Sequence, residues 1–246
     1  ASEMTLYDAV MSIRGEVGTE VLLTIIRKGA DDTLTIKIVR EHVDIESVSM
    51  EDKGDGVFVI SVNQFSDDTK TEFSEKISRI LLNDPKGIIL DLRFNGGGYL
   101  DIAIDMLSEF LPGQKEVVTM KRKNENDTDK VFVYGNARVP DLPIAVLVNN
   151  GSASASEIVA GAIQDYNRGI VIGEQTFGKG TVQEVETFSD GSSLRITVAE
   201  WFTPAGRGID KVGITPDIIV EMDEDAYYKD KIDPQMDKAV SYLGGL

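Results

Sequence analysis

Apolar residues arrive in runs of about five to eight between turn-forming residues, and from about residue 44 these runs alternate between strand and helix patterns. GIILDLR (87–93) and PIAVLVN (143–149) are apolar at nearly every position, which is typical of strands buried on both faces of a sheet. TKTEFSEKISRILLN (69–83) instead places its apolar residues on one helical face, namely Phe73, Ile77, Ile80 and Leu81. Repeated strand–turn–helix units predict an α/β fold.

The remaining elements follow from the same periodicities. We expect strands at 56–62, 169–174, 181–188 and 192–202, a hairpin formed by 116–122 and 130–135, and helices at 99–111, after 154 and near 234–243. Residues 181–188 and 192–202 are joined by the polar turn SDGS and should also pair as a hairpin. The acidic segment before the last helix has no clear pattern.

The first part of the chain has a different organisation. Residues 5–14 have helical spacing, and two β-rich runs follow at 20–28 and 34–40. A helix and two strands are too small to enclose a core of their own. We therefore expect two domains: residues 1–43, a piece of a separate domain, and residues 44–246, a larger α/β domain.

Composition excludes several classes of function. Acidic residues outnumber basic ones 42 to 25, giving a formal charge of −17, so nucleic acid and anionic membrane surfaces are not expected partners. The absence of cysteine removes disulfides, thiolate metal sites and cysteine nucleophiles. Because His42 is the single histidine, a Ser–His–Asp triad or a two-histidine metal site would have to use it. We expect neither a metal nor a cofactor.

Three polar junctions follow predicted strands, where α/β proteins collect their reactive groups. They are NGGG (95–98), NNGSASAS (149–156) and TFGKGTVQ (176–183). A serine at the start of the helix after 154 could act as a nucleophile, since the unpaired amide of Ala155 would face the developing oxyanion. Gly97 or Gly98 could supply a second amide. Read alone, GSASAS fits an ordinary serine-rich helix cap better than a nucleophile.

Lys179 could supply the base that a serine nucleophile needs. A lysine works in this role only with a neutral amine, which requires burial in an apolar, water-poor site. Gln183, four residues on, would point to the same side of a strand and could orient the amine without adding charge. Read alone, Lys179 fits a solvated loop lysine better than a catalytic base.

Taken together, the junctions resemble the signature of the carboxyl-terminal processing proteases, also called tail-specific proteases. The resemblance runs through DLRFNGGG, VNNGSASASEIVAGA, IGEQTFGKGTVQ, DGSSLRITVAEWFTPAGRGID and KVGITPD, and covers residues 45–220. It implies Ser154 as nucleophile, Lys179 as general base and Gln183 as the residue that orients the lysine. The implied oxyanion donors are the amides of Ala155 and of Gly97 or Gly98.

The resemblance also implies a crotonase-like or Clp-protease-like ββα core combined with a PDZ domain. Residues 1–43 resemble the last helix and closing strands of that PDZ domain, whereas its carboxylate-binding loop and peptide-pairing strand are absent from this sequence. Asp91 and Arg93 are expected to brace the glycine loop. Glu157 is expected to favour the helix N-terminus as an acidic first-turn residue.

The function implied is a serine endopeptidase that cleaves near the C-terminus of unfolded or flexible proteins with apolar C-termini. The resemblance further implies export to a periplasm or the cell exterior, with any membrane anchor outside this sequence, and leaves open a homo-oligomer or a regulatory partner. The alternative is a catalytically silent peptide-binding module on the same fold. An acyl-CoA enzyme of the crotonase type and a structural subunit fit the acidic chain and its glycine-rich junctions less well.

Overall fold

The computed structural model describes residues 12–27, 32–42, 46–122, 127–188, 190–223 and 226–245. The chain divides into two compact units, Ala1–Ile45 and Glu46–Leu246. The division falls close to the boundary expected from the sequence. Each unit has its own architecture, and the nature of the first as part of a PDZ-like domain stays a prediction.

The first unit contains an antiparallel hairpin. Strand β1 (Glu20–Ile25) pairs with β2 (Leu34–Val39), so that Glu20 lies opposite Val39. Most of the predicted helix 5–14 lies outside the described residues. Arg40 joins the hairpin to the preceding segment, since its guanidinium donates to the carbonyls of Ile13 and Glu20 at 2.7 and 3.1 Å.

The second unit is built on a six-stranded sheet in the order β12-β9-β8-β5-β4-β3. All neighbours are parallel except β3 and β4, which are antiparallel. The strands are β3 (Val48–Asp52), β4 (Val57–Val62), β5 (Gly87–Asp91), β8 (Ile144–Val148), β9 (Ile170–Gly173) and β12 (Ile218–Ile219). The two apolar runs predicted to be buried on both faces form β5 and β8 at the centre, and every residue of β8 is buried.

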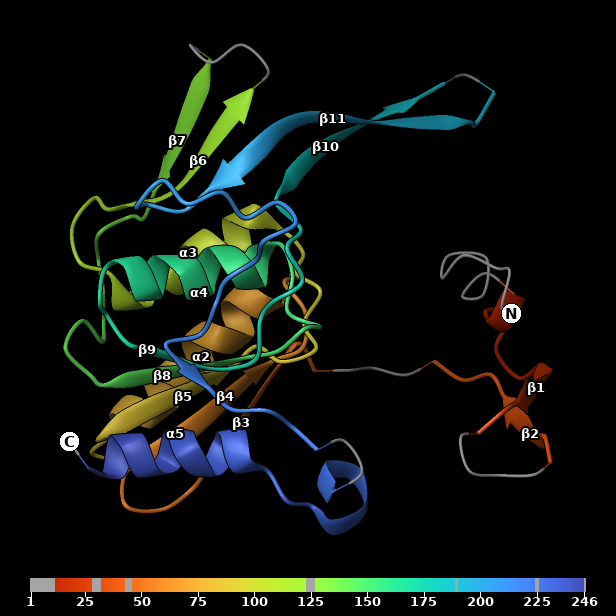
Figure 1. Ribbon diagram of the computed structural model, residues 1–246, viewed down its shortest axis with the longest axis horizontal. Helices are drawn as coiled ribbons and strands as arrows, with labels where there is room; N and C mark the ends of the chain where they lie inside the picture. Colours follow the sequence, from red (N-terminus) through yellow and green to blue (C-terminus); the bar gives the residue numbers. More distant parts are fainter. Residues whose placement is uncertain are drawn as a thin grey trace. The chain divides into compact units, whose positions relative to one another are not determined.

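Helices cover both faces of this sheet. Figure 1 shows α2 (Thr69–Leu81), α3 (Leu100–Phe110) and α4 (Ala155–Asp165) on one face and α5 (Pro234–Gly244) on the other. Two apolar clusters result, a large one beneath α2, α3 and α4 and a smaller one beneath α5. Phe73, Ile77 and Ile80 point inward as predicted, but Leu81 is 43% exposed, because α2 ends there.

A second sheet has the order β10-β11-β6-β7. It consists of β6 (Glu116–Arg122), β7 (Thr128–Phe132), β10 (Thr181–Thr187) and β11 (Ser193–Phe202). Both predicted hairpins are present and antiparallel. The β10–β11 hairpin extends away from the helices (Figure 1).

Three elements have no counterpart in the sequence prediction: β3, the two-residue β12, and a π-helical turn at Ala226–Asp230. The chain is thus a mixed α/β protein, as predicted at the level of class. Within the described residues, no helix is both long and apolar enough to span a bilayer.

Candidate active site

Ser154 lies at the tight turn between β8 and α4, where it is the N-terminal capping residue of the helix. Its backbone has φ 57° and ψ −115°, in the left-handed half of conformational space. Such a conformation is costly for a residue with a Cβ and is found most often at functional sites. The turn therefore holds Ser154 in a strained position at the carboxyl end of the central sheet.

The three serines of GSASAS have different environments. Ser152 is fully buried, where its hydroxyl donates to the Leu92 carbonyl at 2.8 Å and accepts from the Asn149 amide at 3.0 Å. Ser156 is also fully buried and donates to the Asn95 carbonyl at 2.8 Å. Ser154 is half-buried and lies between them. The outer two serines hold the turn together, which leaves Ser154 as the accessible hydroxyl.

The glycine loop after β5 packs directly against this turn. A Cβ placed on Gly97 would lie 2.8 Å from the Ser154 Cβ and 3.0 Å from the Ala155 nitrogen, so only glycine permits this approach. Buried Asn95 joins the two segments, because its backbone carbonyl accepts the Ala153 amide at 3.0 Å. NGGG and NNGSASAS, which are distant in sequence, thus meet at one site.

The two candidate glycine donors differ in their hydrogen bonds. The Gly97 amide donates to the Asn95 side-chain oxygen at 2.9 Å, so it is already engaged. Neither the Gly98 amide nor the Ala155 amide donates to any other described residue. Gly98 is exposed, whereas Gly97 is buried. Gly98 and Ala155 therefore have the free backbone donors at this site.

Glu157 connects the serine turn to the lysine loop. Its carboxyl group is fully buried and accepts four hydrogen bonds, from the Ser154 amide at 2.7 Å, the Thr176 hydroxyl at 2.6 Å, the Gly178 amide at 2.7 Å and the Lys179 amide at 3.0 Å. The expected role at the helix N-terminus is met, but the bridge was not foreseen. The bridge could have been recognised from the complete burial of an acidic residue beside the polar junctions. Burial, however, cannot be read from the sequence.

Lys179 lies next to the serine turn through its backbone, but its side chain differs from the expectation. The residue is exposed, not buried, and within the described residues its amine makes no hydrogen bond to Ser154. Its position is set by the main chain, because Gly178 adopts φ 85° and its carbonyl accepts the Lys211 amide at 2.8 Å. The predicted apolar enclosure of the amine is thus absent from this conformation.

Gln183 also departs from the geometry assumed for it. Strand β10 begins at Thr181, two residues after Lys179, and its pairing register with β11 shifts between Val182 and Gln183. The simple alternation that would place Lys179 and Gln183 on one side does not apply across such a bulge. Gln183 is exposed in this structure.

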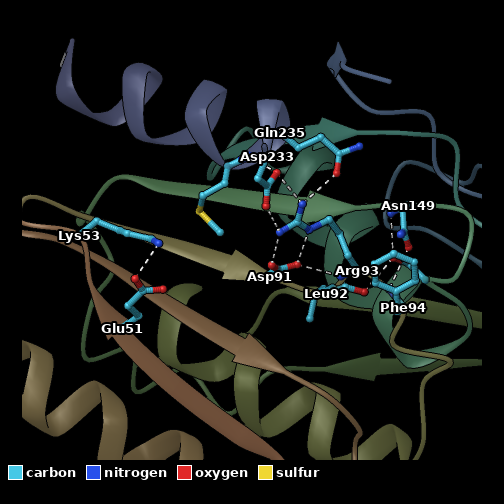
Figure 2. A network of polar contacts seen from close by, with 11 residues as sticks. Glu51, Lys53, Asp91, Leu92, Arg93, Phe94, Asn149, Asp233 and Gln235 are labelled. Atoms are coloured by element: carbon cyan, nitrogen blue, oxygen red, sulfur yellow. Dashed lines mark hydrogen bonds and ion pairs between the residues drawn. The ribbon is translucent and has the colours of Figure 1, made fainter. Parts of the chain in front are cut away.

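Behind the glycine loop, Arg93 forms a network of ion pairs (Figure 2). Its side chain, only 4% exposed, binds Asp91 at 2.7 Å and Asp233 at 2.9 Å, and it donates to Gln235 at 3.2 Å. Burial acts to lower the pKa of Arg93, but the hydrogen bonds that its guanidinium donates to Asp91 and Asp233 outweigh burial and raise the pKa above its ordinary value. The sequence indicated the Asp91–Arg93 brace but not Asp233, which caps α5.

Three further residues lie outside the candidate site. Asp165 pairs with Arg207, and the Arg168 guanidinium donates to the carbonyls of Phe110, Val139 and Leu142. Trp201 is 8% exposed and belongs to the large apolar cluster. His42 lies in the first unit.

The fold and this site define an α/β protein of the serine-peptidase class, in which a strained serine lies beside a glycine loop and a neighbouring lysine loop. The chain belongs to peptidase family S41, whose sequence profile matches residues 56–220.

Named relatives agree with this assignment. The chain is 42% identical over 232 residues to a carboxy-terminal-processing protease of Bartonella bacilliformis, covering 93% of this chain and 53% of that protein. It is 39% identical over 216 residues to a protein named "Probable CtpA-like serine protease" of Staphylococcus aureus, covering 88% of this chain and 43% of that protein. It thus spans about half the length of these curated relatives.

Among solved structures, the chain is similar to the photosystem II D1 C-terminal processing protease. The TM-score is 0.75 at 31% sequence identity, and the similarity covers 89% of this chain and 60% of that one. The resemblance inferred from the sequence motifs is thereby confirmed at the level of the family.

Proposed function

We propose that this chain carries the catalytic core of a serine endopeptidase that cleaves near protein C-termini, with Ser154 as nucleophile and Lys179 as general base. The observation that best supports the proposal is the Glu157 bridge, which holds the amides of Ser154 and Lys179 on one oxygen atom at 2.7 and 3.0 Å. The two proposed catalytic residues are therefore neighbours, although 24 residues separate them (155–178).

In the proposed reaction, the neutral Lys179 amine accepts the Ser154 proton as Oγ attacks the peptide carbonyl carbon. The amides of Ala155 and Gly98 donate to the resulting oxyanion, and losing one such donor costs about 3–4 kcal/mol of transition-state stabilisation. When the C–N bond breaks, the Lys179 ammonium gives its proton to the leaving amine. Lys179 then accepts a proton from a water molecule that attacks the acyl carbonyl carbon, and it returns this proton to Ser154 Oγ as the ester bond breaks.

Lys179 must turn toward Ser154 and lose contact with water for this chemistry. Its long side chain is exposed and its backbone is fixed by Glu157, so rotation about side-chain bonds can bring the amine inward without moving the loop. A bound peptide would cover the amine and supply the missing apolar enclosure. Gln183 is proposed to orient the amine in that state.

The substrates proposed are unfolded or flexible proteins with apolar C-termini, and the names of two relatives support processing at the C-terminus. The core is proposed to be crotonase-like, and residues 1–43 to be the closing part of a PDZ-like domain. Export to a periplasm or the cell exterior belongs to the same proposal, as does regulation by a partner or by self-association. None of these requires a metal or a cofactor.

The test is cleavage of an unfolded protein with an apolar C-terminus by the parent chain and by Ser154→Ala and Lys179→Ala. Lys211→Ala is the matched control, because the Lys211 side chain is 91% exposed on the segment that contacts Gly178. We expect cleavage by the parent and the control and a loss on the order of 10³-fold or more in both active-site variants. Full activity of folded Lys179→Ala would refute its role as base.

A second function is favoured by one observation, the exposed Lys179 side chain that makes no hydrogen bond to Ser154. The same site would then act as a catalytically silent peptide-binding module. Peptide binding to the parent without cleavage, and without labelling of Ser154 by a fluorophosphonate, would favour this alternative.

A further inference from the structure

Two phenylalanine side chains are unusually exposed beside the candidate active site. Phe177 is 67% exposed and Phe94 is 54% exposed, and they are the two most exposed phenylalanines in the described part of the chain. Burying a phenylalanine side chain stabilises a protein by about 1.5–3 kcal/mol. Phe94 and Phe177 belong to neither apolar cluster and contribute little to folding through burial.

The backbone of each is fixed directly to the serine turn. The Phe94 amide donates to the Asn149 side-chain oxygen at 2.8 Å, and Figure 2 shows Phe94 beside Asn149. The Phe177 amide donates to the Ser152 carbonyl at 3.0 Å. The two phenylalanines thus enter from different loops and are bonded to residues on the N-terminal side of Ser154.

Phe94 is also held in an unfavourable conformation. Its φ is 60°, a left-handed value that is rare for a bulky side chain and costs on the order of 1–3 kcal/mol. A Cβ on Gly151 would lie 2.8 Å from the Phe94 Cα, so a glycine at position 151 of the serine turn leaves room for Phe94. Strain and exposure at one aromatic residue beside a nucleophile indicate a role in binding.

The surroundings of these two rings are uncharged in sequence. No acidic or basic residue occurs in 94–100, 149–156 or 175–178, whereas 27% of the whole chain is charged. Tyr99, 57% exposed, follows the glycine loop and adds a third aromatic ring. The exposed rings of Phe94 and Phe177 lie on uncharged loops that are bonded to the serine turn, so an apolar side chain is favoured there over an ionised one.

We infer that Phe94 and Phe177 form an apolar subsite that binds an apolar side chain within one residue of the scissile bond of an extended peptide. The inference rests on the proposed peptidase function and adds to it the residues that select the cleavage position. Selection of this kind acts locally, beside the bond that breaks, and is separate from recognition of a distant C-terminus.

The experiment uses internally quenched peptides that differ at a single position, carrying Leu, Ser or Asp on either side of one cleavable bond. The variants are Phe94→Ala, Phe177→Ala and the double variant, with Phe94→Leu and Phe177→Leu as apolar replacements. Phe132→Ala is the control, since Phe132 is 45% exposed on β7 and outside the site. A fluorophosphonate reports the reactivity of Ser154 independently of the peptide side chain.

For the parent we expect the Leu peptide to exceed the Asp peptide in kcat/KM by about tenfold or more at one of the two positions. That preference should fall to within about threefold in the double alanine variant and return in the leucine variants, while Ser154 labelling and the Phe132→Ala preference stay unchanged. An active double variant that keeps the parent's preference at both positions would overturn the subsite alone. A folded parent that neither cleaves nor reacts at Ser154 would overturn both the subsite and the proposed function.

Discussion

The Glu157 carboxyl group is buried, and all four of its hydrogen-bond donors are neutral groups: three backbone amides and one hydroxyl. Each of its oxygen atoms accepts two donors. An amide in its place would present an N–H group to two of those donors, which cannot both be satisfied. A glutamate therefore suits this position, because its two oxygen atoms accept all four hydrogen bonds and so join the Ser154 turn to the Lys179 loop.

We predict that Glu157→Gln destabilises the fold by roughly 1–3 kcal/mol, the cost of leaving a buried donor unpaired. Because the substitution also separates the two loops, kcat should fall on the order of 10²-fold with a smaller change in KM. Urea unfolding and peptide turnover at a temperature where the variant is folded measure the two effects. Thr176→Ser, which keeps a hydroxyl, is the control, and an unchanged kcat in folded Glu157→Gln would refute the bridge's role.

The sequence alone predicted only part of this candidate site. The motifs predicted that Ser154, Ala155 and the glycine loop would lie together, because such residues sit where strands end and helices begin. The choice between Gly97 and Gly98 depended on an Asn95 side-chain hydrogen bond that no pattern reveals. The exposure of Lys179 was missed because a linear pattern carries no information on which loops cover a side chain.

At the scale of elements, helix α5 is joined to the active-site edge of the sheet by its capping residue. Asp233 accepts the Met236 amide at 2.9 Å as an N-terminal cap, and its other hydrogen bonds come from Arg93. One carboxyl group thus caps the start of helix α5 and also fixes Arg93, the residue next to Phe94. Central strands and helices were predictable from periodicity, whereas this long-range pairing and the short β12 were not, because both depend on tertiary contacts.

We predict that Asp233→Asn lowers the free energy of unfolding by about 1–3 kcal/mol, since Arg93 keeps Asp91 but loses a charged partner. Activity per folded molecule should fall as well, because the glycine loop follows Arg93 directly. Denaturant titration and single-turnover acylation of Ser154 provide the measurements. Asp237→Asn, an exposed acid in the first turn of α5, should change neither.

At the scale of the whole molecule, the excess of acidic residues opposes compaction. The formal charge of −17 is distributed over a chain in which most acids lie at the surface, so mutual repulsion destabilises the folded state. Of the fold, the sequence predicted the α/β class and a division near residue 44, because composition and periodicity change there. It did not predict the separate four-stranded sheet, whose assembly from two distant hairpins is a matter of topology.

Since salt screens this repulsion, we predict that the unfolding temperature rises from low ionic strength to about 1 M NaCl, where the Debye length is about 3 Å. Circular dichroism melting curves measure the change. Equal rises in NaCl and KCl would identify screening as the cause, whereas a fall in both would contradict the prediction.

The pairing of Arg93 with Asp233 has a consequence for the order of events during synthesis. The two residues are 140 positions apart, so the ribosome delivers the arginine long before its second carboxylate partner. Until residue 233 emerges, the buried guanidinium lacks one of the partners that offset its desolvation. The network behind the glycine loop can therefore be completed only after residue 233 has emerged, late in the synthesis of the chain.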